Sequence, residues 1–148
     1  MKPSKTLSYA IKALAILAGE DARRPVPCRV LAERGEIPER FLLQILRALV
    51  HKGILKSTRG VVGGYSLARP DYEVCLLEIV EAIDGRLSFE LDDCQPLSEP
   101  LAETLIVVTQ RMRDQLAAVS LADVAVRSAE RRPLPTVEPQ VTAPGLVA

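Results

Sequence analysis

The chain of 148 residues is 48% hydrophobic and contains two Phe, three Tyr and no Trp, which predicts one domain with an aliphatic core and short appendages. Its net charge is zero, but the charges are unevenly distributed, with 13 basic and 5 acidic residues up to Arg69 and an acidic excess beyond it. This distribution indicates that the first half meets a polyanion. Three widely spaced cysteines argue against a disulfide scaffold. No stretch approaches the ~18 uninterrupted apolar residues that a membrane span needs, and no cleavable leader is expected. These features predict a cytoplasmic protein without a membrane partner.

The first helix is predicted over residues 5–19, because apolar side chains recur there at spacings of three and four and Gly19 lies where the pattern stops. Pro25 and Pro27 mark a loop. A short helix over 28–34 follows, and residues 35–38 form a tight turn. Pro38 suits the first turn of the next helix, where its missing N–H has no partner to lose.

The third helix, over 38–52, has two different faces. One is predicted to be a buried apolar stripe and the other a polar surface, because their members alternate at spacings of three and four. The apolar stripe comprises Phe41, Leu42, Ile45, Leu46, Leu49 and Val50, and the polar face comprises Arg40, Gln44, Arg47 and His51.

Two short strands, 54–57 and 65–68, are predicted to form a hairpin around the turn-rich segment TRGVVGG. A helix, a short helix, a tight turn, an amphipathic helix and a hairpin are the elements of a winged helix-turn-helix in their usual order. The fold class is therefore mainly α with a small β-hairpin wing. Arg59 and Gly60 fall at the tip of the wing, where an arginine can enter a narrow minor groove.

Helical patterns continue after the hairpin. Residues 76–84 are predicted as a helix ended by Gly85, and the acidic loop 86–96 separates it from a long helix over 97–118. The long helix carries an apolar stripe at the spacing of helix-on-helix packing, which a second copy of the chain would cover. We therefore predict that Leu101, Leu105, Val108 and Met112 form a dimer interface. Ser120 and Asp123 are placed as a capping box for a last short helix.

The segments SYAIKALAILA, VLAERGEIPERFLLQILRALVHKGIL, STRGVVGGYSLARP, EIVEAIDG and SLADV follow one another in the order and at the spacing of a known family. In these segments the chain resembles the Rrf2 family of bacterial winged-helix regulators, from about Ser4 to Asp84 and more loosely to about Val126. The resemblance implies a homodimer on a dyad-symmetric operator in double-stranded DNA. It implies a recognition helix in each major groove and a wing along each minor groove.

The predicted elements also divide the chain into four parts. Residues 1–84 would form the winged helix-turn-helix, and 85–96 an acidic loop at the position where relatives sense their effector. The dimerisation helix and a short terminal helix would occupy 97–130. The Pro-rich tail, 131–148, is predicted to be disordered.

The expected DNA contacts are the start of the recognition helix, the tip of the wing and the basic or polar residues beside them. Arg40 and Gln44 are predicted to read bases, because Arg pairs with guanine and Gln with adenine in the major groove. Arg47 and His51 are expected to face phosphate or solvent. Lys56 and Ser57 are expected at phosphates, which position the protein without specifying sequence. The full set is Pro38, Glu39, Arg40, Phe41, Gln44, Arg47, Lys56, Ser57, Arg59 and Gly60.

The sequence departs from the family pattern at three places. Val61 and Val62 replace the Pro-Gly of many wings, and Leu43 stands where the cluster-binding regulator has an acidic base-reading residue. Operator preference is therefore not transferable. Cluster-binding relatives also carry three closely spaced cysteines after the fourth helix, whereas the loop here has only Cys94.

The cysteines leave several interpretations open. An iron–sulfur cluster needs about four ligands, and the spacing here does not supply them, so we predict neither a metal nor another cofactor. Cys94 is a candidate redox thiol, although Asp92 and Asp93 disfavour its ionisation. Cys28 and Cys75 fall near predicted helix starts, where a thiol pKa can be lowered, or they simply pack.

The sequence predicts a DNA-binding transcriptional regulator, expected to be a repressor, with its effector undetermined. Two alternatives remain. Winged helices also serve as protein-interaction modules, and a sensor that uses Cys94 as a thiol or cluster ligand would be a redox switch. An enzyme is disfavoured, because one His and no Cys–His or Ser–His–Asp spacing offer no nucleophilic chemistry.

Overall fold

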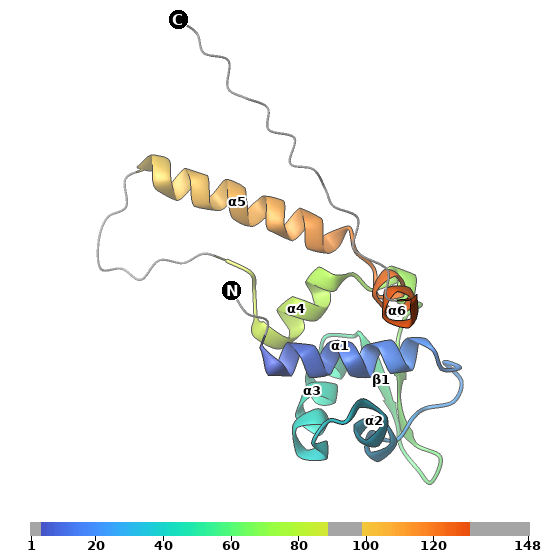
Figure 1. Cartoon of the computed structure of the whole chain (residues 1–148). Helices are drawn as coiled ribbons and strands as arrows, with labels where there is room; N and C mark the ends of the chain where they lie inside the picture. Colours follow the sequence, from blue (N-terminus) through green and yellow to red (C-terminus); the bar gives the residue numbers. More distant parts are fainter. Residues whose placement is uncertain (1–3, 89–98, 131–148) are drawn as a thin grey trace, which may run out of the picture.

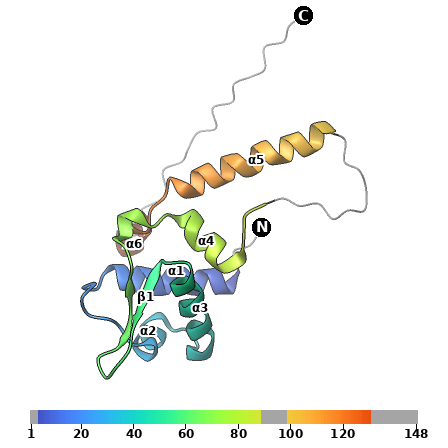
Figure 2. The same ribbon diagram turned by 180° about the vertical axis from the view of Figure 1, so that it is seen from behind.

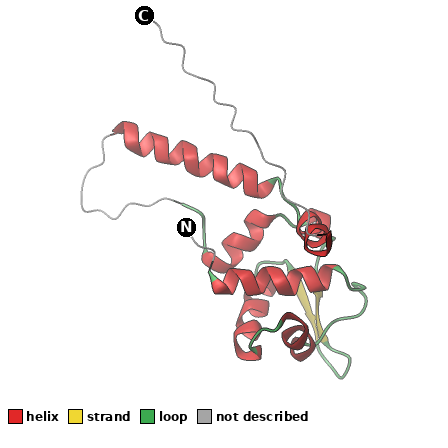
Figure 3. Ribbon diagram, viewed as in Figure 1, coloured by secondary structure: helices red, strands yellow, loops and turns green. Residues whose placement is uncertain are grey.

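A computed structural model of the chain describes residues 4–88 and 99–130, and it is mainly helical with one antiparallel hairpin (Figures 1 and 3). This confirms the predicted fold class. The elements in chain order are α1 (Lys5–Ala18), α2 (Cys28–Gly35), α3 (Glu39–His51), β1 (Leu55–Thr58), β2 (Gly64–Leu67), a 3-10 turn η1 (Asp71–Glu73), α4 (Leu76–Asp84), α5 (Glu99–Ala117) and α6 (Leu121–Glu130).

The predicted elements are present with ends shifted by a residue or two, and only η1 was not expected. The tail 131–148 and the loop around Cys94 lie outside the described residues. None of the helices in the described part combines the length and hydropathy needed to cross a bilayer.

Helix α1 forms the centre of the core. Its start is capped by Ser4, whose hydroxyl accepts a hydrogen bond from the Leu7 N–H at 3.0 Å. Ala10, Ala13 and Leu14 are completely buried. Because α2, α3, α4 and α6 all pack against it, α1 is the scaffold on which the other helices are placed.

The tight turn between α2 and α3 fixes the helix-turn-helix. Glu36 takes the left-handed conformation, with φ of 52°, and the Ile37 N–H reaches back to the Ala32 carbonyl at 2.9 Å. Ile37 is buried at 4% exposure against Gly35, where a Cβ would come within 2.9 Å of the Ile37 side chain. The left-handed conformation of Glu36 costs free energy for a residue with a side chain. The burial of Ile37 offsets this cost and holds the turn in place.

The hairpin pairs Leu55 with Leu67 and Ser57 with Tyr65. A third segment joins it, because Val26 and Tyr65 exchange backbone hydrogen bonds of 2.9 and 2.8 Å. Gly64 lies so close to this segment that a Cβ would fall 2.4 Å from the Val26 carbonyl. The wing is thus attached to the loop between α1 and α2 by a pairing that leaves no room for a side chain at residue 64.

Helix α6 returns to the main body and completes the core (Figure 2). Leu121 is completely buried, and its N–H donates to the Val74 carbonyl at 2.7 Å. The predicted capping box is confirmed, because Ser120 N–H donates to the Asp123 carboxylate at 2.9 Å and the Asp123 N–H donates to the Ser120 hydroxyl at 3.2 Å. The core therefore extends past the boundary predicted at residue 84.

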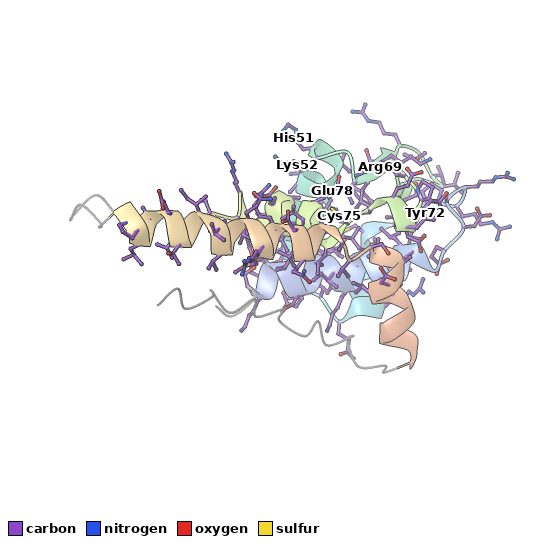
Figure 4. The ribbon with its side chains drawn as sticks, turned by 90° about the horizontal axis from the view of Figure 1, so that it is seen from above. His51, Lys52, Arg69, Tyr72, Cys75 and Glu78 are labelled. Atoms are coloured by element: carbon purple, nitrogen blue, oxygen red, sulfur yellow. The ribbon has the colours of Figure 1, made fainter. Side chains whose placement is uncertain are left out.

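Two ion pairs fix α4. Burial raises the pKa of the Glu78 carboxyl, but hydrogen bonds from Arg69, at 2.7 Å, and from the Cys75 N–H, at 3.1 Å, more than offset this and lower it overall (Figure 4). Glu81 binds Arg113 of α5 and the Leu87 N–H, and these contacts likewise outweigh desolvation and lower its pKa. The Glu81–Arg113 pair thus connects α4 to α5.

We predict that Gly64→Ala destabilises the protein by ~1–3 kcal/mol, the usual cost of forced backbone strain. The new methyl group would push Val26 away from Tyr65 and break their two hydrogen bonds. Urea unfolding followed by circular dichroism measures this. Gly19→Ala is the matched control, because Gly19 has φ of −84° and its nearest neighbour would be 3.5 Å away. Equal stability of the two variants would contradict the prediction.

Candidate nucleic-acid interface

The outward face of α3 carries the predicted reading residues. Arg40, Gln44 and Arg47 are all exposed, and their spacings of four and three place them on one side of the helix. The opposite side is anchored in the core by four buried residues, Leu42, Ile45, Leu46 and Leu49. The amphipathic pattern therefore orients α3 so that its polar face meets solvent.

The interpretation of Phe41 as part of the buried stripe was wrong. Its side chain is 61% exposed, and Val50, at the other end of the stripe, is only half-buried. Phe41 lies in the first turn of α3, directly after the turn from α2. Its side chain lines a surface hollow with Gln44 of the same helix.

A groove lies between the second half of α3 and the wing. It has a volume of about 590 Å³ and brings Arg47 and His51 of α3 together with Ser57 and Arg59 of the hairpin. Val50, Thr58, Gly64 and Tyr65 complete its wall. Helix α3 and the hairpin thus present guanidinium, imidazole and hydroxyl donors into one concave surface, which is the donor set that binds phosphate.

Four exposed cations of α3 and the wing take no part in the ion pairs of the described residues. Within residues 4–88 and 99–125 the ion pairs join Arg29 to Glu33, Arg34 to Glu20, Arg69 to Glu78 and Arg113 to Glu81. Arg40, Arg47, Lys56 and Arg59 take part in none of them. Within the described residues no ion-pair partner competes with an external anion for these four cations.

The structure separates two residues that were predicted together. Ser57 pairs across the hairpin with Tyr65 and faces the groove, whereas Lys56 pairs with Ser66 and faces away from it. Successive side chains of a strand point to opposite faces. Lys56 therefore lies on the far side of the wing from Ser57 and Arg59.

The remaining predicted residues are also on the surface. Pro38 caps α3, Glu39 is exposed beside it, and Gly60 takes φ of 113° at the tip of the wing. Phe41 and Gln44 line a second hollow of about 400 Å³ with Lys5, Thr6 and Tyr9 of α1. Thr58 and Tyr65 of the groove were not predicted, because only the pairing of the strands reveals them.

The surroundings of Cys28 oppose its reactive thiolate form. Burial, followed by the negative charge of Glu39, raises the pKa of Cys28, which overturns the idea that the start of α2 lowers it. Cys28 and Cys75 are free and half-buried. Cys94, the candidate redox thiol, lies outside the described residues.

A recognition helix anchored by its apolar face, a hairpin wing beside it and unpaired cations on both define a DNA-binding protein of the winged helix-turn-helix class. Residues 3–127 match the Rrf2 family, described as iron-dependent transcriptional regulators. The chain belongs to the Rrf2 family, as the sequence predicted, and is a DNA-binding transcriptional regulator.

Individual relatives agree with this membership. The chain is 34% identical over 131 residues to Rv1287 of Mycobacterium tuberculosis, named as an HTH-type transcriptional regulator, covering 84% of this chain and 81% of the relative. It is similar to the solved structure of T. potens IscR, with a TM-score of 0.70, 27% identity and coverage of 90% and 93%. The structure of CymR, the global cysteine regulator of B. subtilis, has the same fold, with a TM-score of 0.72 at 24% identity over 85% and 97% of the two chains.

The described residues do not fit the iron that the family's description names. Among them, no group of three or more His, Cys, Asp or Glu side chains is placed to hold a metal ion. The raised pKa of Cys28 opposes the thiolate that a metal ligand requires.

Proposed function

We propose that the protein acts as a homodimeric repressor on a dyad-symmetric operator, in the cytoplasm. The observation that carries this proposal is the groove in which unpaired Arg47 and Arg59, from two different elements, meet. A polyanion that runs along this groove neutralises both cations at once. With α3 on one side and the wing on the other, the groove has the form that receives a DNA backbone between two points of base contact.

The division of roles follows from position. Arg40 and Gln44, on the exposed face of α3, would enter the major groove and read base edges. Arg47 and Ser57, in the groove behind them, would hold phosphates and set the register. Arg59, beside the left-handed Gly60, would reach the minor groove, where a narrow width concentrates negative potential.

The dimer is proposed from α5. Leu101 and Val108 are each 44% exposed, Val107 is 50% exposed and Ile106 is 69% exposed, and the helix extends away from the main body (Figures 1 and 2). Leu105 and Met112, also in the predicted stripe, are half-buried, and α5 packs against α4. A helix with apolar residues on several sides is normally covered on several sides, and a second copy of α5 would provide that cover.

A dimer would also explain the geometry of the proposed target. Two recognition helices related by a two-fold axis contact half-sites about 34–36 Å apart, or a multiple of one helical turn. Each operator half would then carry the same sequence in opposite orientation. The ion pair between Glu81 and Arg113 would hold the two reading heads at a fixed angle to α5.

We expect Arg59→Ala to weaken binding by ~1–3 kcal/mol, the usual worth of a good groove contact. The duplex is one selected by the wild-type protein from a random library, and the affinity is titrated at fixed salt. Arg59→Ala also removes a cation that would contact the DNA backbone or its minor groove, so the slope of log K against log salt should decrease by about one.

The control for Arg59 is Arg86→Ala, which removes an exposed arginine just after α4. It should leave the affinity within about twofold. An Arg59→Ala affinity equal to that of wild type would remove the wing from the proposed interface. Binding by the wild-type protein that hardly depends on salt would favour a protein-interaction module instead.

We expect Val108→Glu to weaken dimerisation at least tenfold, because an unpaired carboxylate would be buried between two apolar helices. Sedimentation equilibrium at micromolar concentrations measures the dissociation constant. Gln115→Glu, which places the same charge at an exposed polar position of α5, is the control and should dimerise like the wild type. A wild-type protein that remains a monomer would refute the proposed dimer.

We also propose that the protein works without an iron–sulfur cluster. Anaerobic purification followed by an absorption spectrum and an iron assay should then yield a colourless protein with no stoichiometric iron. Visible absorption together with two or four irons per chain would overturn this proposal. It would then direct attention to Cys94 and its loop.

A further inference from the structure

A larger cavity opens on the far side of the wing from the DNA groove. It lies between the loop that joins α1 to α2 and the hairpin face that carries Lys56, Thr58 and Ser66, and its volume is about 750 Å³. Small-molecule sites are typically ~300–1,000 Å³ in volume. The complete lining comprises Ala22, Arg23, Arg24, Pro25, Pro27, Lys56, Thr58, Val61, Val62, Gly63 and Ser66.

Ser66 is the unusual residue of this cavity. It is 3% exposed, and its hydroxyl has no hydrogen-bond partner within the described chain. Buried hydroxyl groups in proteins nearly always have a partner, and one that lacks it needs an explanation. A ligand oxygen that enters the cavity would supply the missing partner.

The charge of the cavity is of one sign. Arg23, Arg24 and Lys56 line it, all three are exposed and none belongs to an ion pair in the described ranges. No Asp or Glu is part of the lining. The nearest acidic residue in the sequence, Asp21, instead accepts a hydrogen bond from the Arg23 backbone N–H at 2.9 Å. The cavity is therefore suited to an anion.

Most of the remaining lining is apolar. Ala22, Pro25 and Pro27 come from the loop, and Val61 and Val62 come from the wing. The two valines are 106% and 86% exposed, which is costly for apolar side chains unless something covers them. A bare phosphate would leave this apolar part empty, whereas a molecule with an apolar body would fill it.

We propose that this cavity binds a small organic carboxylate with an apolar body. The carboxylate would lie between Lys56 and Ser66, which stand opposite each other on β1 and β2, once the exposed Lys56 side chain moves aside to pair with it. The apolar body would lie against Val61, Val62 and the two prolines. Because the other face of the same hairpin carries Ser57 and Arg59, a ligand here would touch the wing from behind.

The test measures binding to the full-length protein in the absence of DNA, so that its failure is independent of the proposed DNA function. The probes are hexanoate, octanoate and 4-phenylbutyrate, and isothermal titration calorimetry measures the binding of each. Inorganic phosphate supplies the charge without the apolar body, and 4-phenylbutanol supplies the body without the charge. At least one carboxylate should bind saturably and at least tenfold more tightly than either control compound.

Two variants locate the site. Lys56→Glu should weaken carboxylate binding on the order of tenfold, since a favourable charge becomes a repulsive one. Lys52→Glu makes the same charge change at the end of α3 (Figure 4), outside this cavity, and should bind like the wild type. Equal effects of the two variants would overturn the proposal.

Ser66→Ala gives a signature that a purely structural role would not produce. Removing a buried hydroxyl that has no partner should raise the melting temperature of the free protein, while loss of the ligand's hydrogen bond should weaken binding by about fivefold. Unchanged carboxylate binding in this variant would overturn the proposed site. No saturable binding of any of the three carboxylates, or binding of phosphate as tight as theirs, would also overturn it.

Discussion

The backbone pairing of Val26 with Tyr65 is the constraint on which both faces of the wing depend. Two short strands alone make a marginal hairpin, and the hydrogen bonds of 2.9 and 2.8 Å to Val26 attach this one to the loop after α1. Gly64 permits the approach, because any Cβ there would meet the Val26 backbone. The pairing sets the wing at a fixed place beside α3, which creates the groove on one side and the cavity on the other.

The groove and the cavity differ because adjacent residues of a strand face opposite ways. Ser57 and Tyr65 look toward α3, where Arg47 and His51 add their donors. Lys56 and Ser66 look toward the loop and its prolines. One four-residue strand can therefore serve a polyanion on one face and a small ligand on the other, and a rigid hairpin would couple the two mechanically.

Helix α5 is placed by a different kind of interaction. Its polar side chain Arg113 is held by Glu81 of α4, whereas Ile106, Val107 and Val108 remain on the surface. An ion pair that is partly shielded from solvent can fix direction, but it buries little apolar area. In the proposed dimer, α5 would gain its stability from the second chain, and α4 would transmit the resulting geometry to the helix-turn-helix.

The sequence by itself determined the order of the elements, the winged-helix class and the exposed polar face of α3, because periodicity and capping are local properties. The spacing of Leu42, Ile45, Leu46 and Leu49 orients a helix whatever it packs against, and Ser120 with Asp123 predicts a helix start from four residues. Tertiary structure alone decided that Phe41 is exposed and that Lys56 and Ser57 lie on opposite faces of the wing. It also decided that Leu121 completes the core and that Ser66 is buried without a hydrogen-bond partner in the described chain. These outcomes depend on which elements meet and on strand register, and no local pattern in the chain specifies contacts between residues so far apart.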